Sequence, residues 1–183
     1  EKFSGRCYFK NDTLTFCPFD FEFIKTYSAV LKYNYLEFIN GRYPFKMKVV
    51  KSEIKQKLSI DTLKFSDYAL FTYDTSFYNC FSGNVTSYDL NDKELNRVDS
   101  ILYKCITDNL RRTPDRYYRQ CLAIKNPSNE RIVYIKCFCK EHSFSSSYKL
   151  GIIDVHDGGD CFFVVKINLD RNSYFDLSIN GLG

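Results

Sequence analysis

Residues 92–110, "DKELNRVDSILYKCITDNL", are the segment that most constrains the fold of this chain. Apolar residues recur in it at spacings of three and four, as on one face of an α-helix. Asn91 and Glu94 match the capping box that begins a helix. Thr113-Pro114 is expected to end it, because proline disfavours helical geometry in the preceding residue. Such a helix needs an apolar surface to cover. Its apolar stripe consists of Leu95, Val98, Ile101, Leu102, Cys105, Ile106 and Leu110.

The sequence after this helix has the composition of β-strands. Branched and aromatic residues fill "RYYRQCLAIKN" and "ERIVYIKCFCKEH", and the turn sequence "NPSN" separates them. "CFFVVKINL" and "SYFDLSIN" flank "DRN" in the same way, and alternation in the last segment places Phe175, Leu177 and Ile179 on one face. Two hairpins are therefore predicted. The predicted fold class is α+β, with an amphipathic helix packed on an antiparallel β-meander.

The first half of the chain gives less regular patterns. "FIKTYSAVLKYNYLEFI" has apolar and aromatic residues at helical spacing before the stop signal Asn40-Gly41, which predicts a first helix. Further strands are expected in "PFKMKVVKSEIKQKLSIDTLKF" and "DYALFTYDTSFYNCFSG". The second of these loosely matches "DCFFVVKINLDRNSYFDLSING", which suggests two helix-and-sheet units, 1–88 and 89–183. The alternative is one α+β domain, 1–183.

A helix followed by an antiparallel meander resembles the cystatin-like family, and a doubled arrangement resembles its tandem members. The resemblance rests on element order and implies inhibition of papain-like proteases. The family's Gln-x-Val-x-Gly loop is absent from the sequence, and its Pro-Trp hairpin is absent because the chain has no tryptophan. Gly5 lies near the N-terminus as the family's glycine does. No inhibitory residue can be carried over to this chain.

The cysteines suggest an oxidising compartment. Their number is even and their spacings form no paired C-x-x-C metal motif, which favours disulfides over a metal site. Cys137 and Cys139 share one side of a predicted strand, so each is expected to bond to a different neighbour such as Cys161, Cys121 or Cys105. Cys7 and Cys17 are expected to close a small loop. The predicted disulfide cysteines are Cys7, Cys17, Cys80, Cys105, Cys121, Cys137, Cys139 and Cys161.

Two N-glycosylation sequons, at Asn11 and Asn84, lie in polar stretches typical of surface loops. No stretch has the length of uninterrupted apolar sequence that a membrane-spanning helix needs. Residues 1–10 also lack the apolar centre of a signal peptide. We therefore expect a secreted or extracellular glycoprotein whose signal peptide has been removed. The alternative is a cytosolic protein with buried free thiols.

Residues 154–163, "DVHDGGDCFF", combine three aspartates with one of only two histidines. The segment fails the calcium-loop template, and two histidines are too few for a typical zinc site, so no metal or cofactor is predicted. Gly158-Gly159 favours a tight turn, since glycine readily adopts positive φ. If the segment is instead catalytic, the expected residues are His156, Asp154 and Asp157, because an aspartate can orient an imidazole.

A second candidate lies in "RRTPDRYYRQ", where arginines alternate with tyrosines. The net charge of +4 is mild and no nucleic-acid motif accompanies it, so nucleic acid is not the expected partner. The 15 tyrosines and 17 phenylalanines exceed what a core of this size needs, which is typical of protein-binding surfaces. The candidate binding residues here are Arg116, Tyr117, Tyr118 and Arg119.

These observations favour a secreted, disulfide-stabilised protein-binding module, either inhibitor-like or a subunit of an extracellular assembly. Its partner would be another protein or further copies of itself. An enzyme is the less favoured class. The alternative hypothesis is a small α+β enzyme or ligand carrier with a pocket near His156 or His142.

Overall fold

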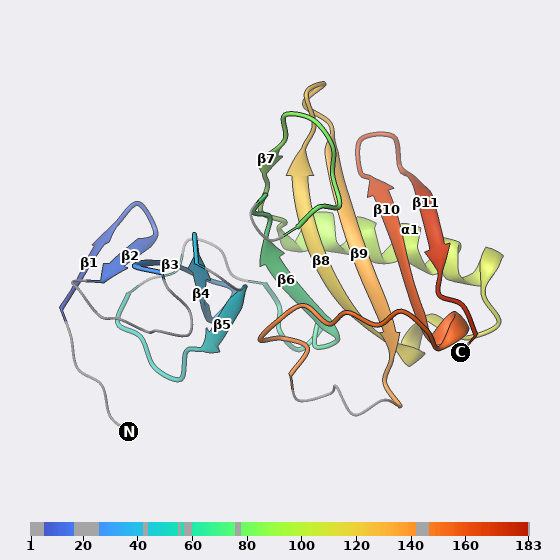
Figure 1. The fold of residues 1–183 in the computed structure, drawn as a ribbon, viewed down its shortest axis with the longest axis horizontal. Helices are drawn as coiled ribbons and strands as arrows, with labels where there is room; N and C mark the ends of the chain where they lie inside the picture. Colours follow the sequence, from blue (N-terminus) through green and yellow to red (C-terminus); the bar gives the residue numbers. More distant parts are fainter. Residues whose placement is uncertain are drawn as a thin grey trace.

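The computed structural model describes residues 6–16, 26–41, 44–54, 56, 60–75, 78–141 and 147–182. Two β-sheets and one long helix make up these parts of the chain, so the fold is α+β as predicted (Figure 1). The first sheet is an antiparallel meander in which each strand pairs with the next one along the chain. Its strands are β1 Cys7–Lys10, β2 Thr13–Phe16, β3 Ser28–Lys32, β4 Tyr35–Ile39 and β5 Phe45–Lys48.

The second sheet has the order β11-β10-β9-β8-β6, and the short β7 also pairs with β8. The meander β8 to β11 is antiparallel, which confirms both predicted hairpins. The edge strand β6 pairs in parallel with β8. The two strands can run in the same direction because α1 lies between them in the chain and carries the backbone back to the end of the sheet where β6 began. These elements are β6 Tyr68–Thr72, β7 Thr86–Ser87, α1 Asp92–Asn109, β8 Tyr117–Lys125, β9 Arg131–Cys139, β10 Phe162–Asn168 and β11 Ser173–Ile179, with 3-10 turns at Pro114–Arg116 and Gly159–Cys161.

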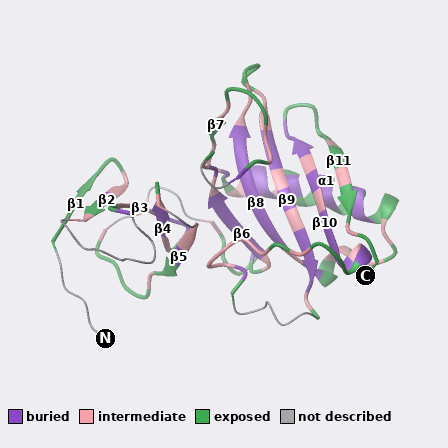
Figure 2. Ribbon diagram, viewed as in Figure 1, coloured by how far each residue is buried: buried purple, intermediate pink, exposed green. Residues whose placement is uncertain are grey.

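The helix α1 begins and packs as its sequence predicts. The Asn91 side chain accepts a hydrogen bond from the Glu94 amide at 3.1 Å, and the Glu94 carboxylate accepts one from the Asn91 amide at 3.0 Å. The helix ends at Asn109, ahead of Pro114. Its predicted stripe from Leu95 to Ile106 is buried in the main core against β8, β9 and β10, where Figure 2 also shows most of the buried residues.

The predicted first helix is wrong. Its described residues form β3 and β4, a hairpin in which Leu31 faces Leu36 and Lys32 faces Tyr35. Tyr33 and Asn34 make the turn with φ of 53° and 64°, a left-handed geometry that ends any helix. The same apolar residues that fit helical spacing therefore alternate across two short strands.

The last strand is also less regular than predicted. Val164 pairs with Ser178 while Lys166 pairs with Phe175, so β11 carries a β-bulge opposite β10. Asp176 sits in this bulge with a φ of 50°. An extra residue in one strand breaks the alternation of side chains, and the prediction that Phe175, Leu177 and Ile179 share one face fails for this reason.

The cysteines form a smaller disulfide framework than predicted. Cys139 bonds to Cys161, which was among the expected neighbours. Cys105, Cys121 and Cys137 are buried with free thiols between helix and sheet, where they pack as small apolar side chains. Cys80 is half-buried and Cys7 is exposed, both with free thiols, while Cys17 lies outside the described residues and leaves the expected Cys7–Cys17 loop a prediction.

Candidate functional site: the open face of the second sheet

The two faces of the second sheet differ in how they are covered. The helix α1 lies across one face, and two loop segments lie on the other (Figure 1). Gln120 in β8 fixes one segment, because its side-chain amide donates to the carbonyls of Tyr148 and Gly151 at 2.6 and 2.8 Å. Phe81 fixes the other segment by an edge-on ring contact with Tyr134. The loops thus cover β8 and part of β9.

Two adjoining pockets remain on this open face. Their volumes are about 550 and 530 Å³, and both are lined by Lys166 and Asp176. The first has Leu122, Tyr134 and Val164 among its lining residues. The second is lined by Phe81, Ile124, Ile132 and Phe175, among others. The two pockets together form a hollowed surface with an apolar floor.

The charges around these pockets are paired with one another. Lys136 Nζ lies 2.7 Å from Asp154 Oδ1, and Lys166 Nζ lies 3.0 Å from Asp176 Oδ2. Arg171 Nε lies 2.6 Å from Glu130 Oε1. The hydrogen bond from Lys136 lowers the pKa of Asp154, so that carboxylate stays ionised at neutral pH. Paired charges leave little net field, and the surface is suited to an uncharged or mixed partner.

The outer edge of β11 lies beside these pockets. β11 is the last strand of the sheet, and no described strand pairs with its outer edge. Phe175 and Ile179 are 40% and 42% exposed. An unpaired strand edge offers backbone N–H and C=O groups to an added strand.

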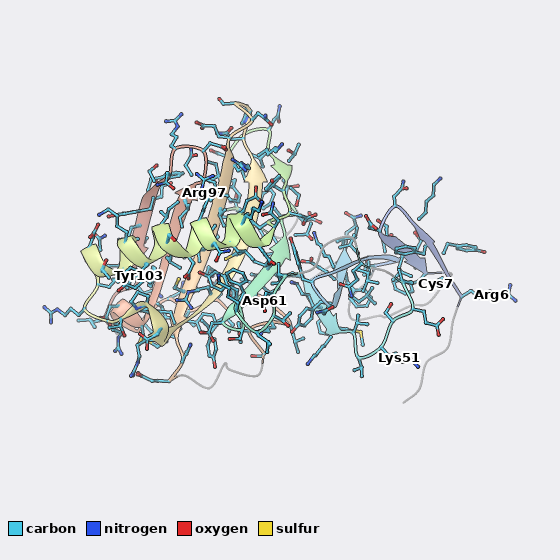
Figure 3. The ribbon with its side chains drawn as sticks, turned by 180° about the vertical axis from the view of Figure 1, so that it is seen from behind. Arg6, Cys7, Lys51, Asp61, Arg97 and Tyr103 are labelled. Carbon is cyan, nitrogen blue, oxygen red and sulfur yellow. A yellow bond between two sulfur atoms is a disulfide. The ribbon has the colours of Figure 1, made fainter. Side chains whose placement is uncertain are left out.

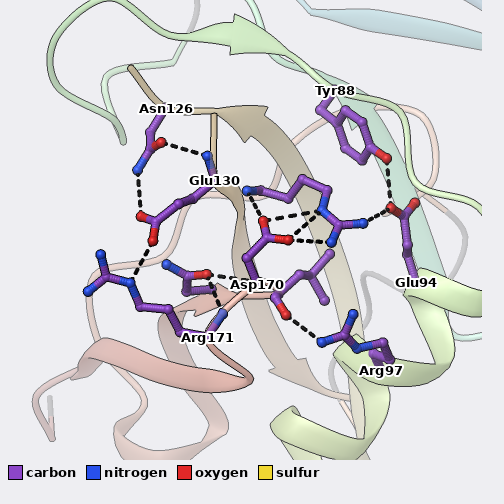
Figure 4. Close-up of polar contacts among 10 residues, drawn as sticks. Tyr88, Glu94, Arg97, Asn126, Glu130, Asp170 and Arg171 are labelled. Atoms are coloured by element: carbon purple, nitrogen blue, oxygen red, sulfur yellow. Dashed lines mark hydrogen bonds and ion pairs between the residues drawn. The ribbon is translucent and has the colours of Figure 1, made fainter. Parts of the chain in front are cut away.

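A polar network fixes the end of the sheet to the helix (Figure 4). Arg131, at the start of β9, bonds to both carboxylate oxygens of Asp170 and donates to Glu94 at 2.7 Å. These bonds hold the pKa of Asp170 at about 2. Tyr88 donates to Glu94 at 2.6 Å, and Arg97 donates to the carbonyl of Leu169. The sequence predicted the capping role of Glu94 but gave no signal for its partners, which come from the start of β9 and from the segment between β7 and α1.

The segment "DVHDGGD" forms the predicted turn. Gly158 and Gly159 have φ of 91° and 57°, and a Cβ on Gly158 would lie 2.6 Å from the ring of Phe162. His156 is almost fully exposed, with Nε2 3.8 Å from Asp154 Oδ2. Asp157 is also exposed, so no described group encloses a reaction centre around these three residues. His142 lies outside the described residues.

The candidate binding residues after α1 do not form one surface. Tyr117 is fully buried and donates to the carbonyl of Asp160, and Arg119 is 5% exposed. Only Arg116 is exposed, while Tyr118 stacks on Tyr148 at 4.3 Å. Alternation along β8 explains this, since every second side chain points into the helix-covered face.

Both sequons lie at the surface. Asn11 is exposed in the tight turn between β1 and β2, with a φ of 51°. Asn84 is exposed in the bend that precedes β7. Each asparagine is therefore accessible to a glycosyl group.

One cluster of described residues has ligand atoms close enough to hold a metal ion, and it consists of Cys139, Glu141 and Cys161. The two sulfur atoms are joined in the disulfide, so neither is free as a thiolate ligand. Within the described part of the chain, no helix is long and apolar enough to cross a membrane. Comparisons of this chain with protein families, curated proteins and solved structures found no match.

Proposed function

We propose that this chain is a secreted protein-binding module that takes an extended segment of its partner onto the open face of the second sheet. The observation that carries the proposal is the pair of apolar-floored pockets beside the unpaired edge of β11. In this binding mode the strand edge supplies backbone hydrogen bonds, and adjoining pockets receive alternate side chains of the added strand. The ion pairs at the rim favour a partner with no strong net charge.

A secreted location is supported by independent features. The exposed asparagines of both sequons can accept glycan, and the Cys139–Cys161 disulfide is typical of an oxidising compartment. The partner is a protein or a further copy of this chain. The role is inhibitor-like, as the cystatin-like resemblance implies, or that of a subunit in an extracellular assembly.

Site-directed photo-crosslinking tests the binding face. A photoreactive amino acid replaces Phe175 on β11, and a matched one replaces Tyr103, which is 57% exposed on the outer face of α1 (Figure 3). Both proteins are irradiated at micromolar concentration, alone and in the extracellular fluid of the source. The proposal predicts a discrete adduct from position 175 that Val164→Lys abolishes. Equal adducts from both positions, or none from position 175, contradict it.

The compartment is tested by the mass of the protein from its native source, before and after reduction and deglycosylation. We expect glycan on Asn11 or Asn84 and one disulfide among the described cysteines. A protein mass that shows neither glycan nor disulfide contradicts secretion. The crosslinking result would still test the binding face, because it does not depend on the compartment.

A ligand carrier is the second candidate. It is favoured by the open-face pocket of about 550 Å³, which is lined by Asp154 next to His156. In that case a small ligand would bind in the pocket, and His156→Ala would weaken its binding. Asp12→Ala is the control variant, because it replaces a polar side chain in the turn between β1 and β2, far from this pocket in the chain. If the binding of every tested small molecule is unchanged by His156→Ala, the candidate is wrong.

A further inference from the structure

A third cavity lies between the two sheets, away from the open face. Its volume is about 270 Å³, and it is lined by residues from β4, β5, β6 and the turn at 147–150. The amide of Lys46 donates to the carbonyl of Leu150 at 2.9 Å, which holds this turn against β5. Lys149 is thereby brought into the same lining as Lys46 and Lys48, which lie about a hundred residues earlier in the chain.

Three lysines line this cavity, and none of their ammonium groups is in direct contact with a carboxylate of the described residues. Of the residues that the structure describes, the lining contains Lys46, Lys48 and Lys149 but no aspartate or glutamate. Among the described residues, none of the three ammonium groups lies within 4.0 Å of a carboxylate oxygen, in contrast to the paired lysines of the open face. Glu37 faces Lys46 across β4 and β5, and its charge favours the protonated form of Lys46, although its two oxygens bond directly to Thr72.

Lys46 is the most deeply placed of the three. It is 3% exposed, and its ammonium donates to the carbonyl of Leu70 and lies 3.9 Å from the centre of the Phe71 ring. An ammonium group has three N–H donors, and the Leu70 carbonyl is its one acceptor among the described residues. Burial lowers the pKa of Lys46 to about 8, and burial also lowers the pKa of Lys149. A bound anion would offset both costs.

Aromatic residues make up part of the remaining lining of the cavity. Tyr35 lies with its ring centre 5.6 Å from Lys46 Nζ, and Phe65 meets Tyr68 edge-on at 5.7 Å. Tyr68 also lines the cavity, and its hydroxyl is bound to Asp99 at 2.6 Å. Rings of this kind favour a flat apolar group stacked or edge-on between them.

We propose that this cavity binds a small aromatic anion, namely one ring that bears a carboxylate, sulfonate or phosphate group. The three lysines hold the anionic group, and Tyr35, Phe65 and Tyr68 hold the ring. The site is separate from the open face of the second sheet, so a partner protein and this anion can bind at the same time.

Calorimetric titration with phenyl phosphate tests the proposal on the full chain. Lys48→Gln and Lys149→Gln each remove one charge from the lining, and Lys51→Gln removes one from an exposed position outside it (Figure 3). We expect each lining variant to weaken binding about tenfold, as for loss of one charged hydrogen bond. Lys51→Gln should change binding by less than about twofold.

Three further outcomes decide the proposal. Unchanged thermal unfolding of the lining variants shows that they still fold, and weaker binding then supports the site. Inorganic phosphate that binds as tightly as phenyl phosphate overturns the role of the aromatic walls. Phenyl phosphate that fails to bind, or binds equally to all three variants, overturns the site itself.

Discussion

The two sheets differ in the interactions that stabilise them. The second sheet and α1 share an extensive apolar core, in which Leu95, Ile106 and Val165 are fully buried. The first sheet has a separate cluster with only Ala29 and Phe38 fully enclosed, among the described residues. So small a core cannot offset the conformational entropy of ordering five strands. The first sheet must therefore gain stability from its contacts with the second.

Tyr33, in the turn between β3 and β4, is buried in the main core, and the polar contacts between the sheets include two at the free edge of β6. The Thr72 amide and hydroxyl donate to Glu37 at 2.8 and 2.7 Å, and Lys46 donates to the carbonyl of Leu70. Two side chains thus replace the strand that would otherwise pair with β6, which protects an exposed edge. Lys32 binds Asp89 at 2.5 Å and extends the junction to the loop before α1. The comparison teaches that the second sheet is stabilised mainly by its apolar core, whereas the first sheet relies also on buried polar and charged contacts.

The largest effect is expected from the apolar core. Leu102→Ala removes a side chain that is 1% exposed between α1 and the sheet, and should lower the free energy of unfolding by about 2–5 kcal/mol. Denaturant unfolding measures it. The exposed neighbour Tyr103→Ala is the control and should cost about 0.5 kcal/mol or less. If both variants lost a similarly small free energy of unfolding, the second sheet would not depend on its apolar core.

Glu37→Ala should be the next most damaging change. It leaves the Thr72 amide and the buried Lys46 ammonium without their acidic neighbour, at a cost of about 3 kcal/mol to the junction. We expect faster hydrogen exchange in β3 to β5 and little change in β8 to β10. Glu53→Ala, which removes the same charge from an exposed position, is the control. Faster exchange in both sheets would show that the first sheet does not open independently of the second.

Arg131→Lys tests whether polar bonds also matter within the second sheet. Lysine cannot reproduce the two-pronged contact with Asp170 while also reaching Glu94, so we expect a loss of about 1–2 kcal/mol in chemical unfolding. Lys104→Ala breaks only the exposed pair with Asp108 and should leave the unfolding midpoint nearly unchanged, because solvent screens exposed pairs. Equal losses in the two variants would contradict a structural role for the network.

A pH dependence is also expected. Burial lowers the pKa of Lys46 to about 8, so the folded state releases this proton before the unfolded state, whose lysine has a pKa of 10.5. Since the unfolded state then binds more protons, stability should rise between about pH 8 and pH 10. Above pH 10 it should fall, because burial raises the pKa of Tyr33 and Tyr68. Lys46→Met should remove this rise in stability. If the rise persists in that variant, another titrating group causes it.

Local signals made the second half of the fold predictable. The capping box at Asn91 and the turn compositions between β8 and β9 and between β10 and β11 each lie within a few neighbouring residues. The hairpin of β3 and β4 was missed because its apolar spacing also fits a helix. Asn34 was the available signal, since asparagine tolerates the left-handed geometry of the turn.

The sites depend on contacts that no local pattern contains. The parallel pairing of β6 with β8 joins segments on either side of α1, and it creates the edge that Glu37 and Lys46 cover. The lysines of the cavity come from β5 and from a turn after β9. Their charge is visible in the sequence, but their proximity is set by tertiary contacts.

Native-state hydrogen exchange, resolved by residue, tests the contrast between the sheets most directly. The account predicts that amides of β3 and β4 exchange through openings of lower free energy than amides of β9 and β10, and that Glu37→Ala lowers only the former. Equal opening free energies in both sheets, falling together in Glu37→Ala, would contradict it and show one cooperative unit.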